Sequence, residues 1–166
     1  MPPETHTSRE MFDADGWDLN PSILLRGGWV SVLGLDLPED HIVYGIGRLL
    51  EKKEIKVHYR VVTEPVPEKK FEEIDIEWSQ AAFNAIFREF HPSPLIFDFA
   101  PAPLLLFLEA GTDYYVIAGE RRFVEDVIGN TTPLVFRDFM ISLGALGQKA
   151  QKNFRILADT YFKIEP

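Results

Sequence analysis

Hydrophobic and polar residues alternate with period two along several short stretches, a pattern that predicts strands with one buried and one solvated face. Residues 55–61 and 74–78 show this alternation most regularly. The full set of candidate strands is residues 29–33, 55–61, 74–78, 95–99, 104–109 and 114–118. Short turn segments rich in Gly, Pro or Asp separate most of them, as expected for neighbouring strands of a sheet.

The segment Ala110-Gly111-Thr112-Asp113 is the best hairpin signal in the chain, because it joins two apolar runs through a Gly- and Asp-containing turn. Residues 104–108, before this turn, are all leucine or phenylalanine. A strand without polar positions has no face for water, so we expect residues 104–108 to lie centrally in the sheet and to be covered on both faces.

Apolar residues at helical spacing predict five helices, which cover residues 39–53, 79–90, 120–128, 132–143 and 148–162. Their ends carry the usual signals. Ser79 is a candidate N-cap, Gly129 is placed to end the third helix, and Thr132 before Pro133 is an N-cap and first-turn pair for the fourth. Three of these helices follow the last strand.

Strands grouped ahead of a run of helices indicate an α+β fold rather than an alternating α/β fold. We therefore expect a largely antiparallel sheet of about five strands, with helices packed against it and a helical C-terminal third. The length of 166 residues fits one domain. We assign residues 1–20 to a flexible N-terminal arm and residues 21–166 to a single α+β domain.

The chain contains no cysteine, which excludes disulfides, thiolate nucleophiles, iron–sulfur clusters and thiolate zinc sites. Residues 1–10 are polar and lack the apolar run of a secretory signal peptide. The longest strongly apolar stretch is far shorter than the roughly 20 residues that cross a bilayer. We expect a cytoplasmic protein without a membrane association, and no cofactor.

The net charge of −9 disfavours nucleic-acid binding, which needs a basic surface to neutralise phosphates. The charge is uneven, since residues 48–60 are net basic and residues 61–98 net acidic. An antiparallel pairing of two candidate strands would oppose Lys56, His58 and Arg60 to Glu73, Asp75 and Glu77. That pairing explains both clusters without any partner.

The alternative interpretation of the acidic cluster is an interaction surface that attracts a basic protein by electrostatic steering. Its candidate residues are Glu72, Glu73, Asp75 and Glu77. Both interpretations depend on the same strand, and the sequence leaves them open.

Motifs for catalysis and metal binding are missing from the sequence. The four histidines, His6, His41, His58 and His91, form no HExxH or HxH arrangement. Residues 13–18 resemble a calcium loop but lack its glycine at the sixth and glutamate at the twelfth position, so we interpret them as an Asp/Gly turn. We assign no catalytic residue and no metal ligand.

One segment has the chemistry of an anion site. Gly119, Arg121 and Arg122 lie where a predicted strand passes into a predicted helix, and free backbone N–H groups at such a junction can bind an anion together with arginines. Glycine at such junctions is also common for geometric reasons alone.

Three functions fit these observations. The first is a non-enzymatic module that binds a protein partner, in its most concrete form an immunity or antitoxin protein that neutralises a basic partner; aromatic residues suit such interfaces. The second is an enzyme or small-ligand protein with an anionic substrate near residues 119–122. The third is a structural subunit, such as a homodimer formed through the terminal helix or a strand edge.

Overall fold

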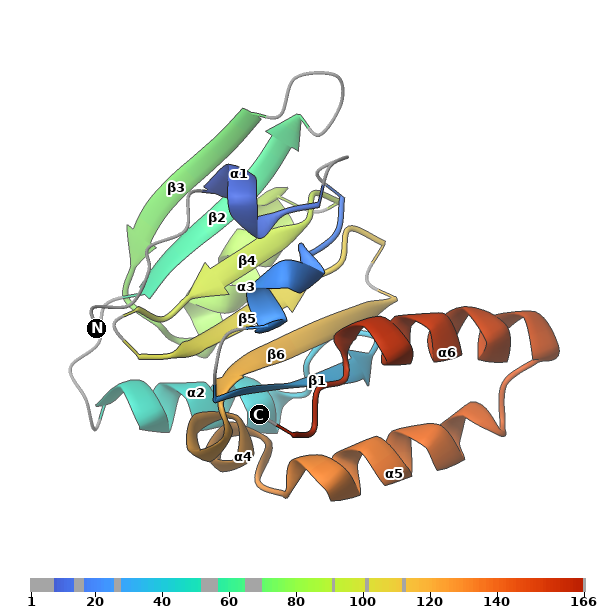
Figure 1. Ribbon diagram of the computed structural model, residues 1–166. Helices are drawn as coiled ribbons and strands as arrows, with labels where there is room; N and C mark the ends of the chain where they lie inside the picture. Colours follow the sequence, from blue (N-terminus) through green and yellow to red (C-terminus); the bar gives the residue numbers. More distant parts are fainter. Residues whose placement is uncertain are drawn as a thin grey trace.

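The computed structural model contains one six-stranded sheet in the order β1-β6-β5-β4-β2-β3, and every neighbouring pair in it is antiparallel (Figure 1). It describes residues 8–13, 17–25, 28–51, 57–64, 70–90, 92–100, 102–111 and 113–165, and for residues 8, 9, 57–64 and 70–74 the backbone alone. The strands are β1 (Trp29–Leu35), β2 (Val57–Glu64), β3 (Lys70–Ile76), β4 (Leu95–Asp98), β5 (Leu104–Leu108) and β6 (Tyr114–Glu120). The helices are α1 (Ser8–Met11), the 3-10 helix η1 (Pro21–Leu25), α2 (Asp40–Glu51), α3 (Gln80–Phe90), α4 (Arg121–Ile128), α5 (Thr132–Leu143) and α6 (Gln148–Tyr161).

The α+β fold class, the antiparallel sheet and the helical C-terminal third are therefore confirmed. The hairpin predicted at residues 110–113 joins β5 to β6, which pair antiparallel from Leu104↔Gly119 to Leu108↔Tyr115. The sheet has six strands rather than about five, because each of the six candidate segments forms one. The boundaries of β2 and β3 differ from the predicted ranges, since pairing and not alternation alone decides where a strand ends.

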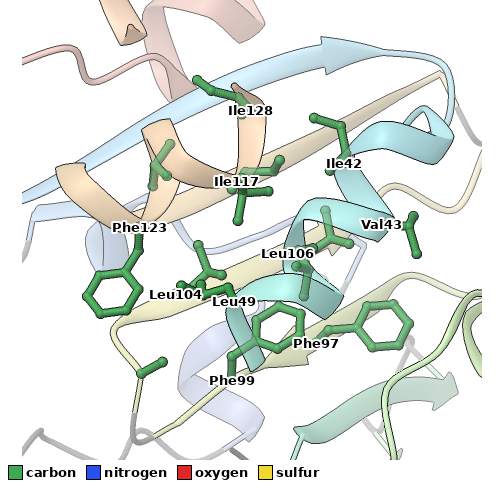
Figure 2. Packing of buried hydrophobic residues seen from close by; sticks show 14 of the residues in the cluster. Ile42, Val43, Leu49, Phe97, Phe99, Leu104, Leu106, Ile117, Phe123 and Ile128 are labelled. Atoms are coloured by element: carbon green, nitrogen blue, oxygen red, sulfur yellow. The ribbon is translucent and has the colours of Figure 1, made fainter. Parts of the chain in front are cut away.

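Apolar side chains fill both faces of the sheet. On one face, α2, α3 and α4 cover a cluster that includes Phe97, Leu104 and Leu106 (Figure 2). On the other face, η1, α5 and α6 contribute to a second cluster that includes Leu105 and Phe107. Alternate residues of β5 thus enter opposite clusters, and all five of its residues are buried. This confirms the prediction of a central strand covered on both sides.

The predicted helix signals act close to the predicted positions. The hydroxyl of Ser79 accepts a hydrogen bond from the N–H of Ala82 at 3.0 Å, as an N-cap does. Gly129 ends α4 in the left-handed conformation. The N-cap of α5 is Thr131 and not Thr132, because Thr132 already has helical geometry and directs its N–H to the Glu125 carboxylate at 2.9 Å.

Part of the predicted N-terminal arm packs against the sheet. Met11, Phe12 and Leu19 are buried in the second cluster, and the Tyr161 hydroxyl donates a hydrogen bond to the Leu19 carbonyl at 2.9 Å. In the described residues 8–13 and 17–20 the chain is therefore part of the domain and not a free arm. These three large apolar side chains lie within nine residues of the sequence, and this clustering could have indicated that the segment packs against the domain.

Strands β2 and β3 pair with the register proposed from their charges. His58 lies opposite Asp75, and Arg60 lies opposite Glu73. In the backbone register, these two basic positions of β2 thus lie opposite acidic positions of β3. This agrees with the charge-balance interpretation of the sequence.

The outer edge of β1 is partly closed by the end of the chain. Ser31 and Lys163 exchange two backbone hydrogen bonds of 2.8 and 3.1 Å, in an antiparallel bridge beyond the last residue of α6. The Lys163 ammonium also donates to the Leu24 carbonyl at 2.9 Å. This bridge uses the outward backbone N–H and C=O groups of one residue of the edge strand, Ser31.

Among the helices that the structure describes, none combines the length and apolar character needed to cross a bilayer.

Candidate functional site

The candidate site is a groove of about 520 Å³ at the free edge of β1. Residues 32–36 at the end of β1 line it, together with the first turn of α2 and one side of α5. In Figure 1, α5 runs alongside β1 at this edge of the sheet. The groove lies beside an edge strand, where residues of α2 and α5 line it together with the end of β1.

Carboxylates surround this groove. Asp36, Glu39 and Asp138 all line it and are all exposed. Glu39 lies 3.0 Å from His41 Nδ1, and Asp138 lies 2.9 Å from the guanidinium of Arg137. Both pairs are on the surface, where such ion pairs contribute little and rearrange easily. The groove thus presents negative charge from two segments, the connection between β1 and α2 and the helix α5.

The interior of the groove is apolar. Ile42 on α2 and Val135 and Phe139 on α5 line it beside the carboxylates. A site with apolar walls and a few convergent charged groups can hold the aliphatic stem of a long basic side chain while its charged end meets the carboxylates.

Tyr115 lies at the back of the groove. Burial, and to a lesser extent the nearby Glu39 carboxylate, together raise the pKa of its hydroxyl to about 12. The phenol is therefore neutral at physiological pH, and it offers a hydrogen-bond donor and an aromatic ring face rather than a base.

Asp36 fixes the geometry of the groove at the end of β1. Its backbone has φ of 59°, in the left-handed region that non-glycine residues rarely adopt. Its N–H donates to the Asp113 carbonyl at 2.9 Å, which closes the ladder between β1 and β6. The turn that follows directs the chain into α2 and so brings Glu39 close to Asp36.

The predicted anion site is occupied by the protein's own groups. Arg121 donates to the Thr132 hydroxyl at 3.0 Å, to the Glu125 carboxylate at 3.3 Å and to the Ile164 carbonyl. Arg122 is exposed and lies 3.0 Å from the Glu120 carboxylate. Carboxylates beside both guanidiniums oppose the binding of an anion.

Gly119 has a packing role at this junction. A Cβ at this position would lie 2.1 Å from the Pro103 carbonyl oxygen, so the neighbouring backbone excludes any side chain. Gly119 also pairs with Val30 on one side and with Leu104 on the other, in the middle of the sheet. Glycine is required at this position because two backbone segments approach each other closely. This is a geometric reason for the glycine, and it does not involve an anion.

The second predicted surface lies at the opposite edge of the sheet, on and just after β3. Asp75 and Glu77 are exposed there. The side chains of Glu72 and Glu73 lie outside the described residues, so the structure does not bring the four carboxylates together or separate them. His6 and His91 also lie outside the described residues.

The two described ends of the Asp-rich segment near the N-terminus lie close together, and the residues between them, 14–16, lie outside the described residues. The Asp13 carboxylate accepts hydrogen bonds from the N–H groups of Trp17 and Asp18 at 3.0 and 3.3 Å. Asp18 accepts a hydrogen bond from the Tyr114 hydroxyl, and burial raises the pKa of Asp18. No group of three or more metal-binding side chains occurs among the described residues.

Sequence reasoning missed the groove, because its residues come from five elements, β1, α2, β6, α4 and α5, and from the connection between β1 and α2. Asp36, Glu39, Tyr115 and Asp138 have no common spacing along the chain. One local signal was available: Asp36-Leu37-Pro38-Glu39-Asp40 places three carboxylates in a single turn. The contribution of α5 depends on the tertiary fold alone.

Comparisons of this chain with models of protein families, with curated proteins and with solved structures give no significant match.

Proposed function

We propose that this chain is a small, acidic, cytoplasmic module that binds and neutralises a basic protein partner, and that the groove beside β1 is its binding site. The observation that carries the proposal is the convergence of Asp36, Glu39 and Asp138 around an open groove with apolar walls. Such a groove matches a lysine or arginine side chain in both parts, the apolar stem and the charged end.

The charge of the whole molecule supports this proposal. With a net charge of −9, the protein creates a negative potential that accelerates its encounter with a basic partner and repels an acidic one. In the most concrete form of the proposal this chain is an immunity or antitoxin protein, and its partner, such as a basic nuclease, has the complementary charge.

The alternative of an enzyme acting on an anionic substrate receives no support from the described residues. Arg121 is engaged with three groups of its own chain, and Arg122 lies beside Glu120. An anion would have to displace these contacts and approach two carboxylates.

The proposal is tested by titrating the protein with a synthetic peptide of alternating arginine and valine, followed by calorimetry at low and at physiological salt. We expect binding that weakens as the salt concentration rises, because the attraction is between exposed charges. A peptide with glutamate in place of arginine should not bind.

A triple variant, Asp36→Asn, Glu39→Gln and Asp138→Asn, identifies the site. Each charge contributes about 0.5 kcal/mol, so together they should change the affinity about tenfold. The matched control is Glu89→Gln, Asp126→Asn and Asp159→Asn, which removes the same charge from exposed positions on α3, α4 and α6. Equal loss of affinity in both variants would contradict the assignment of the groove.

A third variant, Asp75→Asn with Glu77→Gln, tests the surface that the sequence had indicated. It should bind the arginine peptide as the control variant does. Loss of binding in this variant alone would move the interface from the groove to the region of β3.

A further inference from the structure

The hydroxyl of Tyr115 differs from the other buried tyrosine hydroxyls of this protein. Burial raises the pKa of Tyr114, Tyr115 and Tyr161 alike. The Tyr114 hydroxyl donates to the Asp18 carboxylate, and the Tyr161 hydroxyl donates to the Leu19 carbonyl at 2.9 Å. Among the described residues, none forms a hydrogen bond with the Tyr115 hydroxyl. A buried tyrosine hydroxyl usually has a partner, so this one points to a group that comes from outside the chain.

This hydroxyl lies at the floor of the groove. Its oxygen is placed directly over the backbone of Gly34, and both residues line the groove. The Glu39 carboxylate lines the same groove and is close enough to act on the hydroxyl through its charge. A group that enters the groove can therefore contact the phenol and the carboxylate together.

We propose that the groove recognises arginine rather than lysine, and that the Tyr115 hydroxyl beside the Glu39 carboxylate selects it. This inference rests on the proposed function and deepens it, because it names the side chain of the partner that enters the site. A guanidinium carries five N–H donors in one plane. It can donate to the carboxylate and to the phenol oxygen at the same time.

The ammonium of lysine has the same charge but fits this position less well. Its three donors point in tetrahedral directions, so they do not form the parallel pair of hydrogen bonds that a carboxylate accepts from a guanidinium. It is also strongly hydrated, whereas a guanidinium is weakly hydrated. The apolar walls at Ile42 and Phe139 displace water from whichever group enters. Entry therefore costs the ammonium more than it costs the guanidinium.

A structural role does not account for the hydroxyl. The Tyr115 ring covers Gly34 and packs against the apolar cluster under α2, and a phenylalanine ring would do both. Burial of a hydroxyl without a partner costs free energy. The hydroxyl is therefore a group whose benefit lies in binding and not in stability.

The experiment compares two peptides, one of alternating arginine and valine and one of alternating lysine and valine, by calorimetry at low salt. Both peptides carry the same charge, so electrostatic steering is the same for both. The parent protein should bind the arginine peptide at least about tenfold more tightly than the lysine peptide. Tyr115→Phe should weaken the arginine peptide about fivefold to tenfold, and the lysine peptide less than about twofold.

The matched control is Tyr44→Phe. Tyr44 is exposed on α2 and does not line the groove. This variant removes the same hydroxyl group from the same helix-covered face of the molecule, and it should bind both peptides as the parent protein does.

Thermal denaturation of the free variants separates a binding role from a structural one. Tyr115→Phe should melt at the temperature of the parent protein or above it, because it removes a buried hydroxyl that has no partner. Tyr161→Phe should melt at a lower temperature, because the Leu19 carbonyl loses its donor. A clear fall in the melting temperature of Tyr115→Phe would show that its hydroxyl has a partner within the protein, and would contradict the inference.

The binding outcomes separate the two proposals. If the two peptides bind equally and Tyr115→Phe changes neither, the arginine inference is overturned while the basic-partner function stands. Equal weakening of both peptides by Tyr115→Phe also overturns it, because the hydroxyl would then not distinguish arginine from lysine. If neither peptide binds the parent protein at low salt, both proposals are overturned.

Discussion

The ring of Tyr115 occupies the space in which a side chain on Gly34, its cross-strand partner, would lie. A Cβ on Gly34 would be 2.1 Å from Tyr115 Cζ and 2.4 Å from the hydroxyl oxygen. The ring thus covers the backbone of β1 at the floor of the groove, and glycine is the residue that permits it. An aromatic ring laid over a strand glycine restores the packing that the missing side chain would have supplied.

Substitution Gly34→Ala should therefore displace the Tyr115 ring and lower the free energy of unfolding by about 1–3 kcal/mol, the usual cost of overpacking. The measurement is urea denaturation. In a Tyr115→Ala background, the same Gly34→Ala change should cost at least about 1 kcal/mol less, because the clash is absent. Additive effects of the two substitutions would show that the ring and the glycine are not coupled.

Substitutions of Asp36 should rank by their tolerance of the left-handed conformation. Its φ of 59° suits Asn and Gly but costs other residues about 1–2 kcal/mol. We expect Asp36→Ala to lose about 1 kcal/mol of stability, whereas Asp36→Asn stays close to the parent protein and Asp36→Gly does not lose stability through this term. Thermal denaturation of the three variants checks this order, and an Ala variant as stable as the Asn variant would contradict it.

The Asp18 carboxyl should make stability depend on pH in the direction opposite to most paired carboxylates. Burial raises its pKa above the ordinary value of 3.8, and repulsion from Asp13 and Glu109 adds to this, whereas the hydrogen bond from Tyr114 acts against it. The folded state thus holds this proton more tightly than the unfolded state. From this group alone, stability falls as the pH rises from 3.8 through the folded-state pKa, and the penalty is complete above it.

Asp18→Asn should remove that penalty, because the amide oxygen still accepts the Tyr114 hydrogen bond while carrying no charge. We expect the variant to be more stable than the parent protein at neutral pH and no more stable below pH 3.8. Urea denaturation across this range measures the difference. A gain that is equally large at both ends of the range would mean that ionisation of Asp18 is not its cause.

The two adjacent arginines should differ sharply in their contribution to stability. Arg121 connects α4 to Thr132 and to the Ile164 carbonyl, so Arg121→Ala should cost about 1.5–3 kcal/mol. Arg122 is exposed beside Glu120, and Arg122→Ala should change stability by no more than about 0.5 kcal/mol. Inorganic phosphate should not raise the melting temperature of the parent protein, and a rise that Arg121→Ala abolishes would restore the anion-site hypothesis.

Most of the fold could be predicted from the sequence because its strands and helices are regular. Residues 104–108 have no polar position and are indeed covered on both faces. The cap at Ser79 and the left-handed Gly129 mark helix ends through purely local chemistry. The opposed positions of His58 and Asp75 followed from alternation and charge, and the observed register agrees.

The candidate site could not be predicted in the same way, because proximity between distant residues leaves no local pattern. Glu39 and Asp138 face one groove although about a hundred residues separate them. Arg121 had the right chemistry for an anion, but its partner Ile164 lies near the end of the chain. Gly119 was a candidate for the same anion site, but the close approach of the Pro103 backbone explains why this position is glycine.

The separation along the chain of the segments that line the groove also bears on the order in which this protein folds. The hairpin of β5 and β6 closes a loop of few residues, whereas the walls and floor of the groove come from residues 32–42 and 135–142. Long loops are closed late, because their entropy must be lost before distant contacts compensate for it. We therefore expect the groove to form in the last steps of folding, so that it is a feature of the folded protein and not of its intermediates.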